Sequence, residues 1–200
     1  MTQVKICGLS RPCDIDYVNE AIPDYIGFIL RFPQSRRNVT PETAAALKAR
    51  LSPDIKAVGV FVDQPIKTVI EAVEMIGLDV IQLHGHEDGD YIAALRMRTA
   101  LPIWKAFKIR AAADLAVAAV CPADEVLLDN GYGTGAAFDW TLAASFDRPF
   151  LLAGGLTPEN AADAIAALRP KLVDISSGVE TDGYKDFKKI QAAVWAARQS

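Results

Sequence analysis

The sequence has no excess of positive charge and no basic region that stands out. Its 200 residues carry 21 lysines and arginines against 25 aspartates and glutamates, which gives a net charge of -4. A chain of this charge has no basic field that would attract nucleic acid or an anionic membrane, so we expect neither as a partner. A small-molecule metabolic function fits this composition better.

Secretory and membrane-spanning segments are also missing from the sequence. The first ten residues, MTQVKICGLS, contain no basic region followed by an apolar stretch, and no apolar run is long enough to cross a bilayer. The three cysteines, Cys7, Cys13 and Cys121, form no C-x-x-C pair, which argues against a disulfide framework and a structural zinc site. We therefore predict a cytosolic protein with free thiols.

What the sequence does contain is a regular series of short apolar runs. Eight of them begin near residues 4, 25, 57, 80, 103, 126, 150 and 172, with helix-length segments between them. Continuous apolar strands are typical of a parallel sheet that is covered on both faces. The pattern predicts an α/β fold, a single-domain (β/α)8 TIM barrel over residues 1–200. The alternative, an open doubly wound sheet, normally carries a G-x-G-x-x-G motif, which Gly8 after the first strand lacks.

Helix boundaries can be predicted at three places. The segments Thr40-Pro41-Glu42 and Thr157-Pro158-Glu159 each place a threonine N-cap before a proline at the first helical position. A final amphipathic helix is predicted over residues 186–198, with an apolar face formed by Phe187, Ile190, Val194 and Trp195.

Glycines and serines follow the seventh and eighth predicted strands. Gly154 and Gly155 follow the seventh, and Ser176, Ser177 and Gly178 follow the eighth. Paired glycines let backbone N–H groups approach a phosphate, and these two loops form the recurrent phosphate site of this fold. We predict a phosphate-binding site here, although a tight turn and a helix cap would account for the same residues.

Two side chains with titratable groups end apolar strands. Cys7 lies on the same side of its strand as Lys5, in the expected barrel interior, where an ammonium group would lower the pKa of the thiol and favour thiolate. Asp129 ends the sixth strand, where apolar surroundings can raise the pKa of a carboxyl until it acts as a general acid. We predict that they form a proton-transfer pair. Alternatively, Cys7 fills space and Asp129 holds an Asp-Asn-Gly turn.

Further polar residues are expected at the same rim. Arg37 can bind a carboxylate or phosphate through two N–H groups, although an arginine in a Ser-Arg-Arg loop can also be merely solvated. Gln82 and His84 lie at the end of the fourth strand. His84 and His86 should diverge, and no third ligand is evident, so we expect no metal site. The glycine-rich residues 131–135 could form a lid or a simple loop.

Eleven short segments of the sequence together resemble a known family. They occur in the order and at the spacing of phosphoribosylanthranilate isomerases of tryptophan biosynthesis, over residues 4–185. The segments are Val4-Lys5-Ile6-Cys7-Gly8, Gly27-Phe28, Ser35-Arg36-Arg37, Gly59-Val60-Phe61-Val62, Gln82-Leu83-His84-Gly85, Leu127-Leu128-Asp129, Gly133-Thr134-Gly135, Phe138-Asp139-Trp140, Gly154-Gly155-Leu156, Pro158-Glu159-Asn160 and Asp174-Ile175-Ser176-Ser177-Gly178-Val179-Glu180.

The resemblance implies an Amadori rearrangement that uses no cofactor and no metal. N-(5-phosphoribosyl)anthranilate, an aminoaldose, becomes the aminoketose 1-(2-carboxyphenylamino)-1-deoxyribulose 5-phosphate. Asp129 matches the general acid that protonates the ribose ring oxygen and opens the ring to a Schiff base. Cys7 matches the general base that then removes the C2 proton, and the resulting enolamine tautomerises to the ketone.

The resemblance also implies how the substrate is held. Arg37 matches the arginine that faces the anthranilate carboxylate, and Gln82 and His84 match a strand-four motif at the site. The phosphate-binding loops of the family match Gly154, Gly155, Ser176, Ser177 and Gly178.

Three residues depart from the family pattern. Arg36 stands where proline or lysine is common, Asn38 where an aromatic residue is common, and Ala136 where a basic or polar residue is common. We expect these differences to change the packing around the anthranilate end and the charge of the 131–137 segment.

Alternative functions remain open at this stage. One is another phosphosugar barrel enzyme, such as an epimerase or the related histidine-pathway isomerase, which would be expected to have aspartate in place of Cys7. Another is a catalytically silent phosphometabolite-binding module. We expect a monomer, with a homodimer as the alternative.

Overall fold

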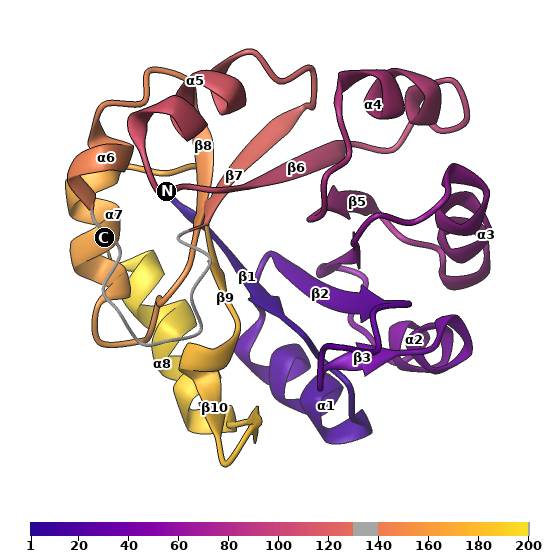
Figure 1. The fold of residues 1–200 in the computed structure, drawn as a ribbon. Coiled ribbons are helices and arrows are strands. Elements are labelled where there is room, and N and C mark those ends of the chain that lie inside the picture. The colour runs from indigo at the N-terminus through magenta and orange to yellow at the C-terminus, as the bar shows by residue number, and fades with distance from the viewer. Residues whose placement is uncertain (130–139, 200) are drawn as a thin grey trace.

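Parallel strands form a closed barrel at the centre of the molecule (Figure 1). The structure, a computed structural model, describes residues 1–129 and 140–199. Within these ranges, eight strands pair in the order β1-β9-β8-β7-β6-β5-β4-β2, and β1 also pairs with β2 and closes the sheet. These strands are β1 (Gln3–Cys7), β2 (Tyr25–Leu30), β4 (Lys56–Phe61), β5 (Val80–Leu83), β6 (Ile103–Lys108), β7 (Glu125–Asp129), β8 (Phe150–Ala153) and β9 (Leu172–Ile175). The predicted (β/α)8 barrel and its eight strands are confirmed.

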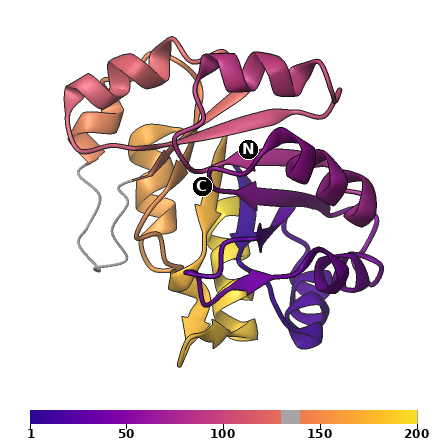
Figure 2. The same cartoon turned by 45° about the vertical axis from the view of Figure 1, so that its right-hand side comes forward.

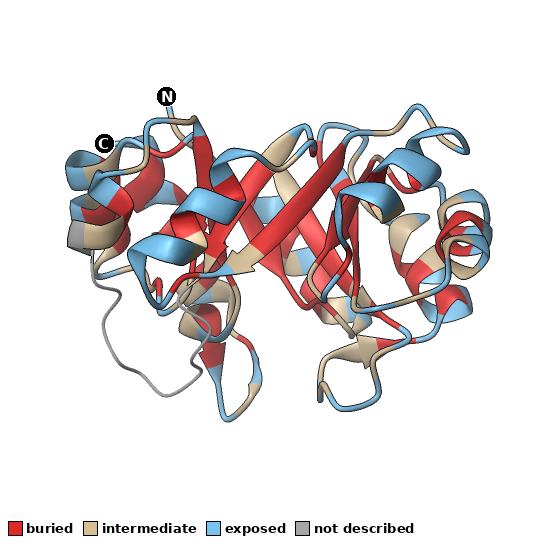
Figure 3. Cartoon of the chain, turned by 45° about the horizontal axis from the view of Figure 1, so that its top comes forward, coloured by how far each residue is buried: buried red, intermediate tan, exposed pale blue. Residues whose placement is uncertain are grey.

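Helices surround the barrel and cover the outer face of the sheet (Figures 1 and 3). Buried residues concentrate on the strands and on the inner faces of the helices, whereas exposed residues lie on the outer helix faces (Figure 3). No helix within the described ranges is long and apolar enough to cross a membrane. The helices are α1 (Pro12–Ala21), α2 (Pro41–Lys48), α3 (Ile66–Ile76), α4 (Gly89–Arg96), α5 (Ala112–Ala119), α6 (Trp140–Ala144), α7 (Ala161–Leu168) and α8 (Phe187–Arg198).

Strand alternation divides the apolar residues into two cores. Successive side chains of a strand point to opposite faces of the sheet. One set packs between the strands and the helices and forms the larger core. The other set fills the inside of the barrel with Val58, Val80, Trp104, Ala106, Leu127, Leu151, Ala153 and Leu172. More polar side chains occupy the C-terminal end of the barrel interior, beyond this apolar cluster.

Four short elements were not predicted from the sequence. β3 (Asn38–Val39) pairs with the end of β2. After β9, the 3-10 helix η1 (Ser177–Val179) leads into an antiparallel hairpin of β10 (Glu180–Thr181) and β11 (Tyr184–Lys185). Two-residue strands give no periodicity that a sequence reading could detect.

The predicted helix starts had different outcomes. α2 begins at Pro41, and its N-cap Thr40 accepts a hydrogen bond from the backbone N–H of Thr43, as predicted. The predicted start at Pro158 is wrong, because α7 begins at Ala161. The side chain of Asn160 instead accepts a hydrogen bond from the Thr157 N–H and holds residues 158–160 in a turn.

The final helix is confirmed, but the prediction of its buried face was partly wrong. α8 packs beside α1, as Figure 2 also shows, and buries Ile190, Ala193, Val194 and Ala197. Trp195 was predicted on this face but is 66% exposed. At 100° per residue, Trp195 lies too far around the helix from Ile190, and Ala197 continues the buried stripe in its place.

Candidate active site

The polar residues of the candidate site face into the C-terminal end of the barrel. Lys5 and Cys7 on β1 are both buried, as the predicted alternation requires. They are accommodated because Gly27 on β2 has no side chain: a Cβ there would lie 2.7 Å from the Cys7 sulfur and 3.1 Å from Lys5 Nζ. The absence of a side chain at Gly27 therefore leaves room inside the barrel for Lys5 and Cys7.

Lys5 forms a buried ion pair at the base of the site. Its Nζ lies 2.8 Å from Oδ2 of Asp174 on β9, and the Lys5 side chain is completely buried. Lys5 also interacts electrostatically with Cys7. Burial opposes the charge of Lys5, but Asp174 and Cys7 outweigh it, so the pKa of Lys5 is raised. Lys5 is therefore a permanent cation beside the thiol.

The pKa of Cys7 depends on burial as well as on the charge of Lys5. Burial raises the pKa of Cys7, and Asp174 adds to this effect. Lys5 and Lys185 lower the pKa but do not compensate, so it lies above the ordinary value of 9.0. Lys5 thus lowers the pKa of Cys7, as predicted, but the net shift is upward because the cost of burying the anion is larger.

Alkylation of Cys7 should report this balance of charge and burial. In a Cys13→Ser/Cys121→Ser background, we expect the iodoacetamide rate to rise with pH and to reach half its maximum above pH 9.0. Adding Lys5→Met should move this midpoint further upward, because the cation is lost while the Asp174 anion remains. An unchanged profile in a variant that is folded by circular dichroism would contradict the role assigned to Lys5.

Asp129 ends β7 and contacts His84, the residue that follows β5. Its Oδ2 lies 3.3 Å from Nε2 of His84, and the two side chains are 18% and 25% exposed. Nδ1 of His84 lies 3.1 Å from Nε2 of Gln82. When the Gln82 amide donates this bond, the neutral His84 ring carries its proton on Nε2, facing Asp129. The structure thus brings Asp129 and His84 together at the mouth of the barrel.

Gln82 is more deeply buried than its neighbour His84. It is 1% exposed, and its Oε1 is buried without a hydrogen-bond partner among the described residues. Its contact with His84 makes it a positioning residue for that ring. Its direct contact with substrate stays a prediction.

Arg37 is held by an acidic residue that the sequence reading did not identify. Its Nε and Nη2 lie 2.6 Å and 2.8 Å from the two carboxylate oxygens of Glu180 on β10. Arg36 Nη2 lies 2.5 Å from the same carboxylate, as does Lys185 Nζ at 2.8 Å. Burial would raise the pKa of Glu180, but Arg37 and Lys185 lower it to about 2. Glu180 is therefore a permanent anion at the centre of three cations.

The loops after β8 and β9 pack closely against each other. Gly154 and Gly155 adopt φ of 94° and 65°, which favour glycine over other residues. The Asn160 side chain donates to the Gly155 carbonyl and fixes the first loop. In the second loop, Ser176 donates its hydroxyl to the Cys7 carbonyl, so this serine ties the loop to β1, whereas Ser177 is exposed.

Gly178 gives a test of this packing. A Cβ at Gly178 would lie 1.9 Å from the carbonyl oxygen of Leu156, so Gly178→Ala must push the two loops apart. We expect it to lower the free energy of unfolding in urea by about 1–3 kcal/mol and to raise the KM for a phosphorylated substrate. Gly89→Ala is the control, since its Cβ would lie 3.7 Å from its nearest neighbour. Equal midpoints and KM values for the two variants would contradict close loop packing.

Two other features lie beside this site. A cavity of about 940 Å³ lies between α4 and α5 and includes His84, but not Cys7, Arg37 or the phosphate loops. His86 pairs with Asp63 at 2.9 Å, apart from His84. No group of three metal-ligating His, Cys, Asp or Glu side chains occurs within residues 1–129 and 140–199. The proposed lid at 131–137, with Ala136, lies outside the described residues.

Comparison with known proteins agrees with this geometry. The family model "N-(5'phosphoribosyl)anthranilate (PRA) isomerase" matches residues 4–196. An N-(5'-phosphoribosyl)anthranilate isomerase of Acetivibrio thermocellus is 44% identical over 100% of this chain and 97% of its own length. The chain belongs to the phosphoribosylanthranilate isomerase family. The resemblance predicted from the eleven segments is thereby confirmed.

Solved isomerases of the family share the whole fold. One, in complex with reduced 1-(o-carboxyphenylamino)-1-deoxyribulose 5-phosphate, has a TM-score of 0.88 and 32% identity, with 100% of both chains covered. Monomers generated from the dimeric isomerase of Thermotoga maritima also give a TM-score of 0.88, with 33% identity and 100% of both chains covered.

The isomerase site contains four functional residues to which the sequence reading gave no role. Asp174 pairs with Lys5, Glu180 holds Arg37, Lys185 binds Glu180, and Asn160 fixes the loop after β8. Three of them lie in the segments that carried the family resemblance. Asp174 and Glu180 contact residues 169 and 143 positions away, so only the fold reveals these two contacts. Lys185 and Asn160 contact residues only five positions away, across a short hairpin and a turn.

Proposed function

We propose that this chain catalyses the Amadori rearrangement of N-(5-phosphoribosyl)anthranilate to 1-(2-carboxyphenylamino)-1-deoxyribulose 5-phosphate. The observation that carries the proposal is the position of Cys7 and Asp129 at the C-terminal ends of β1 and β7, in a chain that matches isomerases over its full length. The reaction needs one acid and one base, and these groups can supply both.

Asp129 is proposed as the acid of the first step. Its carboxyl group donates a proton to the ribose ring oxygen, the C1–O bond breaks, and the anthranilate nitrogen supplies the electrons that form the C1=N bond of a protonated Schiff base. His84 lies against Oδ2 of Asp129, and Gln82 orients His84. These contacts support the proposal because they fix the carboxyl at the mouth of the barrel.

Cys7 is proposed as the base of the second step. Its thiolate takes the C2 proton, and the electrons of the C–H bond move to form the C1=C2 bond of the enolamine, which neutralises the Schiff base nitrogen. Lys5 and Lys185 favour the thiolate against the cost of burial. Because the pKa of Cys7 is raised, we expect the rate of C2 proton removal to rise with pH above neutrality.

Substrate binding is proposed to use both sides of the barrel mouth. Arg37 binds the anthranilate carboxylate, and the phosphate lies against the loops that contain Gly154, Gly155, Ser177 and Gly178. Glycine backbones with positive φ allow close approach to an anion, and the exposed hydroxyl of Ser177 adds a donor. Ser176 stabilises the loop through the Cys7 carbonyl and contacts the phosphate only if this hydroxyl turns away.

Turnover of freshly prepared phosphoribosylanthranilate tests this function. The substrate's fluorescence should disappear with the purified protein, and Cys7→Ala should slow the loss by about 10²–10⁴-fold. A wild-type rate no higher than that of Cys7→Ala would reject the isomerase proposal. Binding without turnover would favour the alternative of a silent phosphometabolite-binding module.

The oligomeric state stays a prediction. We expect a monomer, with a homodimer as the alternative that the dimeric isomerase of Thermotoga maritima illustrates. Equilibrium sedimentation of the purified chain distinguishes the two.

A further inference from the structure

We propose that Glu180 is a positioning residue that sets how the substrate carboxylate is recognised. Glu180 would hold Arg37 so that only its outer nitrogen, Nη1, is presented to the anthranilate carboxylate. This inference rests on the proposed function, in which Arg37 binds that group. It adds a residue on the β10–β11 hairpin to the determinants of specificity.

The contact between Arg37 and Glu180 uses one complete edge of the guanidinium. Nε and Nη2 each donate to a different carboxylate oxygen, in the bidentate geometry that best fixes an arginine. The Glu180 side chain is only 4% exposed, whereas Arg37 is 21% exposed. Within residues 1–129 and 140–199, Nη1 of Arg37 donates no hydrogen bond. The free end of the guanidinium is therefore the end that a ligand can reach.

The stem of Arg37 packs against Gly8, the residue that follows β1. A Cβ at Gly8 would lie 2.5 Å from Cδ of Arg37, so the arginine lies directly over the residue that follows Cys7. Gly8 has φ of 81° and leaves this space open. Arg37 is thus held between Gly8 and Glu180, close to the thiol that is proposed to take the C2 proton.

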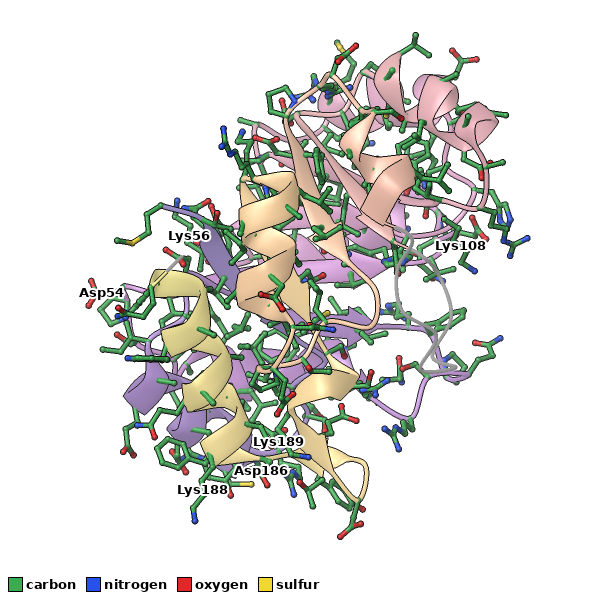
Figure 4. The ribbon with its side chains drawn as sticks, turned by 90° about the vertical axis from the view of Figure 1, so that its left-hand side faces the viewer. Asp54, Lys56, Lys108, Asp186, Lys188 and Lys189 are labelled. Atoms are coloured by element: carbon green, nitrogen blue, oxygen red, sulfur yellow. The ribbon has the colours of Figure 1, made fainter. Side chains whose placement is uncertain are left out.

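Glu180 is itself held in place by other contacts. Lys185 Nζ donates both to Glu180 and to the carbonyl of Ser176 in the proposed phosphate loop. Lys189, near the start of α8 in Figure 4, donates to the Glu180 backbone carbonyl. Arg36, one of the departures from the family pattern, adds a third cation to the carboxylate. The arrangement keeps excess positive charge beside Arg37 while fixing its orientation.

Two inhibitors that differ only in the substrate carboxylate can test this role. One is reduced 1-(o-carboxyphenylamino)-1-deoxyribulose 5-phosphate, and the other is the same compound without the ring carboxylate. For the wild type, we expect the carboxylate to improve the inhibition constant about tenfold, as a charge-assisted hydrogen bond would. In Glu180→Gln this advantage should fall to twofold or less, and the KM for phosphoribosylanthranilate should rise while kcat changes little.

Companion variants separate positioning from a general structural effect. Arg37→Met should lose the same carboxylate advantage, and adding Glu180→Gln to it should cause no further loss. Glu180→Asp keeps the negative charge on a shorter side chain, so the carboxylate should still improve the inhibition constant, but by less than in the wild type. If Glu180→Gln does not fold, Glu180→Asp decides whether the residue at this position sets carboxylate recognition. Glu125→Gln, at an exposed ion pair, is the control and should behave as the wild type.

Two results would overturn the role of Glu180. The first is that Glu180→Gln binds the carboxylated inhibitor as tightly as the wild type or more tightly, which would make Glu180 a neutral residue or a competitor of the substrate. The second is that both inhibitors weaken equally, which would indicate a structural role alone. Failure of the proposed function is distinct, because the wild type would then not turn over phosphoribosylanthranilate at all.

Discussion

Replacing Asp129 with asparagine should lower kcat by about 10²–10⁴-fold, since that is the usual contribution of a positioned general acid. Asparagine has nearly the same shape and can keep the contact with His84, but it has no acidic proton to give to the ribose oxygen. The loss should therefore appear in kcat with little change in KM. The measurement is the disappearance of substrate fluorescence at saturating phosphoribosylanthranilate.

A matched variant shows whether this loss is specific. Asp147→Asn removes the same charge from an exposed position before β8 and should leave kcat unchanged. If Asp129→Asn retained more than a tenth of the wild-type kcat, Asp129 would not be the acid, and the proposed first step would need another proton donor.

Replacing Lys5 with methionine should lower the free energy of unfolding by about 3–5 kcal/mol, because it leaves a buried carboxylate without its partner. Asp174 is only 7% exposed, and its Oδ1 already has no hydrogen-bond partner among the described residues. Urea unfolding followed by circular dichroism measures the loss. The double variant Lys5→Met/Asp174→Leu should recover most of it, since no unpaired charge then remains in the interior.

An exposed ion pair provides the contrast. Lys171→Met breaks a pair with Glu125 in which Lys171 is 49% exposed, and we expect it to cost less than about 1 kcal/mol. If Lys5→Met cost no more than Lys171→Met, the ion pair inside the barrel would not stabilise the fold as its burial indicates.

The barrel could be predicted from the sequence because its signal is local and repeated. Eight apolar strands at similar spacing leave room for little except one helix and two loops in each unit. The same local rules predicted the N-cap at Thr40, since the hydrogen bond to Thr43 spans only three residues. They failed at Thr157, where the side chain of Asn160 competes for the backbone and delays the helix.

The state of Cys7 could not be predicted from the sequence. Strand alternation correctly placed Lys5 beside the thiol, but the sign of a pKa shift depends on the sum of burial and all nearby charges. Asp174 comes from a strand that begins more than 160 residues later, and it partly offsets Lys5. The extent of burial is likewise a property of the closed barrel.

The ion pair between Arg37 and Glu180 could not be predicted either, because it joins residues that are far apart in the sequence. Glu180 lies 143 residues beyond Arg37 and reaches it through a hairpin of two-residue strands. Arg36 and Asn38, two of the departures from the family pattern, have structural roles here: Arg36 binds Glu180, and Asn38 accepts a hydrogen bond from the Phe32 N–H. Neither contact leaves a periodic signal in the sequence.

The division of labour between Asp129 and Cys7 is the central claim, and a deuterium isotope effect tests it most directly. Single-turnover rates would be compared for phosphoribosylanthranilate with hydrogen or deuterium at C2. Cys7→Ser should make C2 proton removal limiting and show a full primary isotope effect, whereas Asp129→Asn should make ring opening limiting and show none. The reverse pattern, or equal isotope effects in the two variants, would contradict the assignment of Cys7 as the base and Asp129 as the acid.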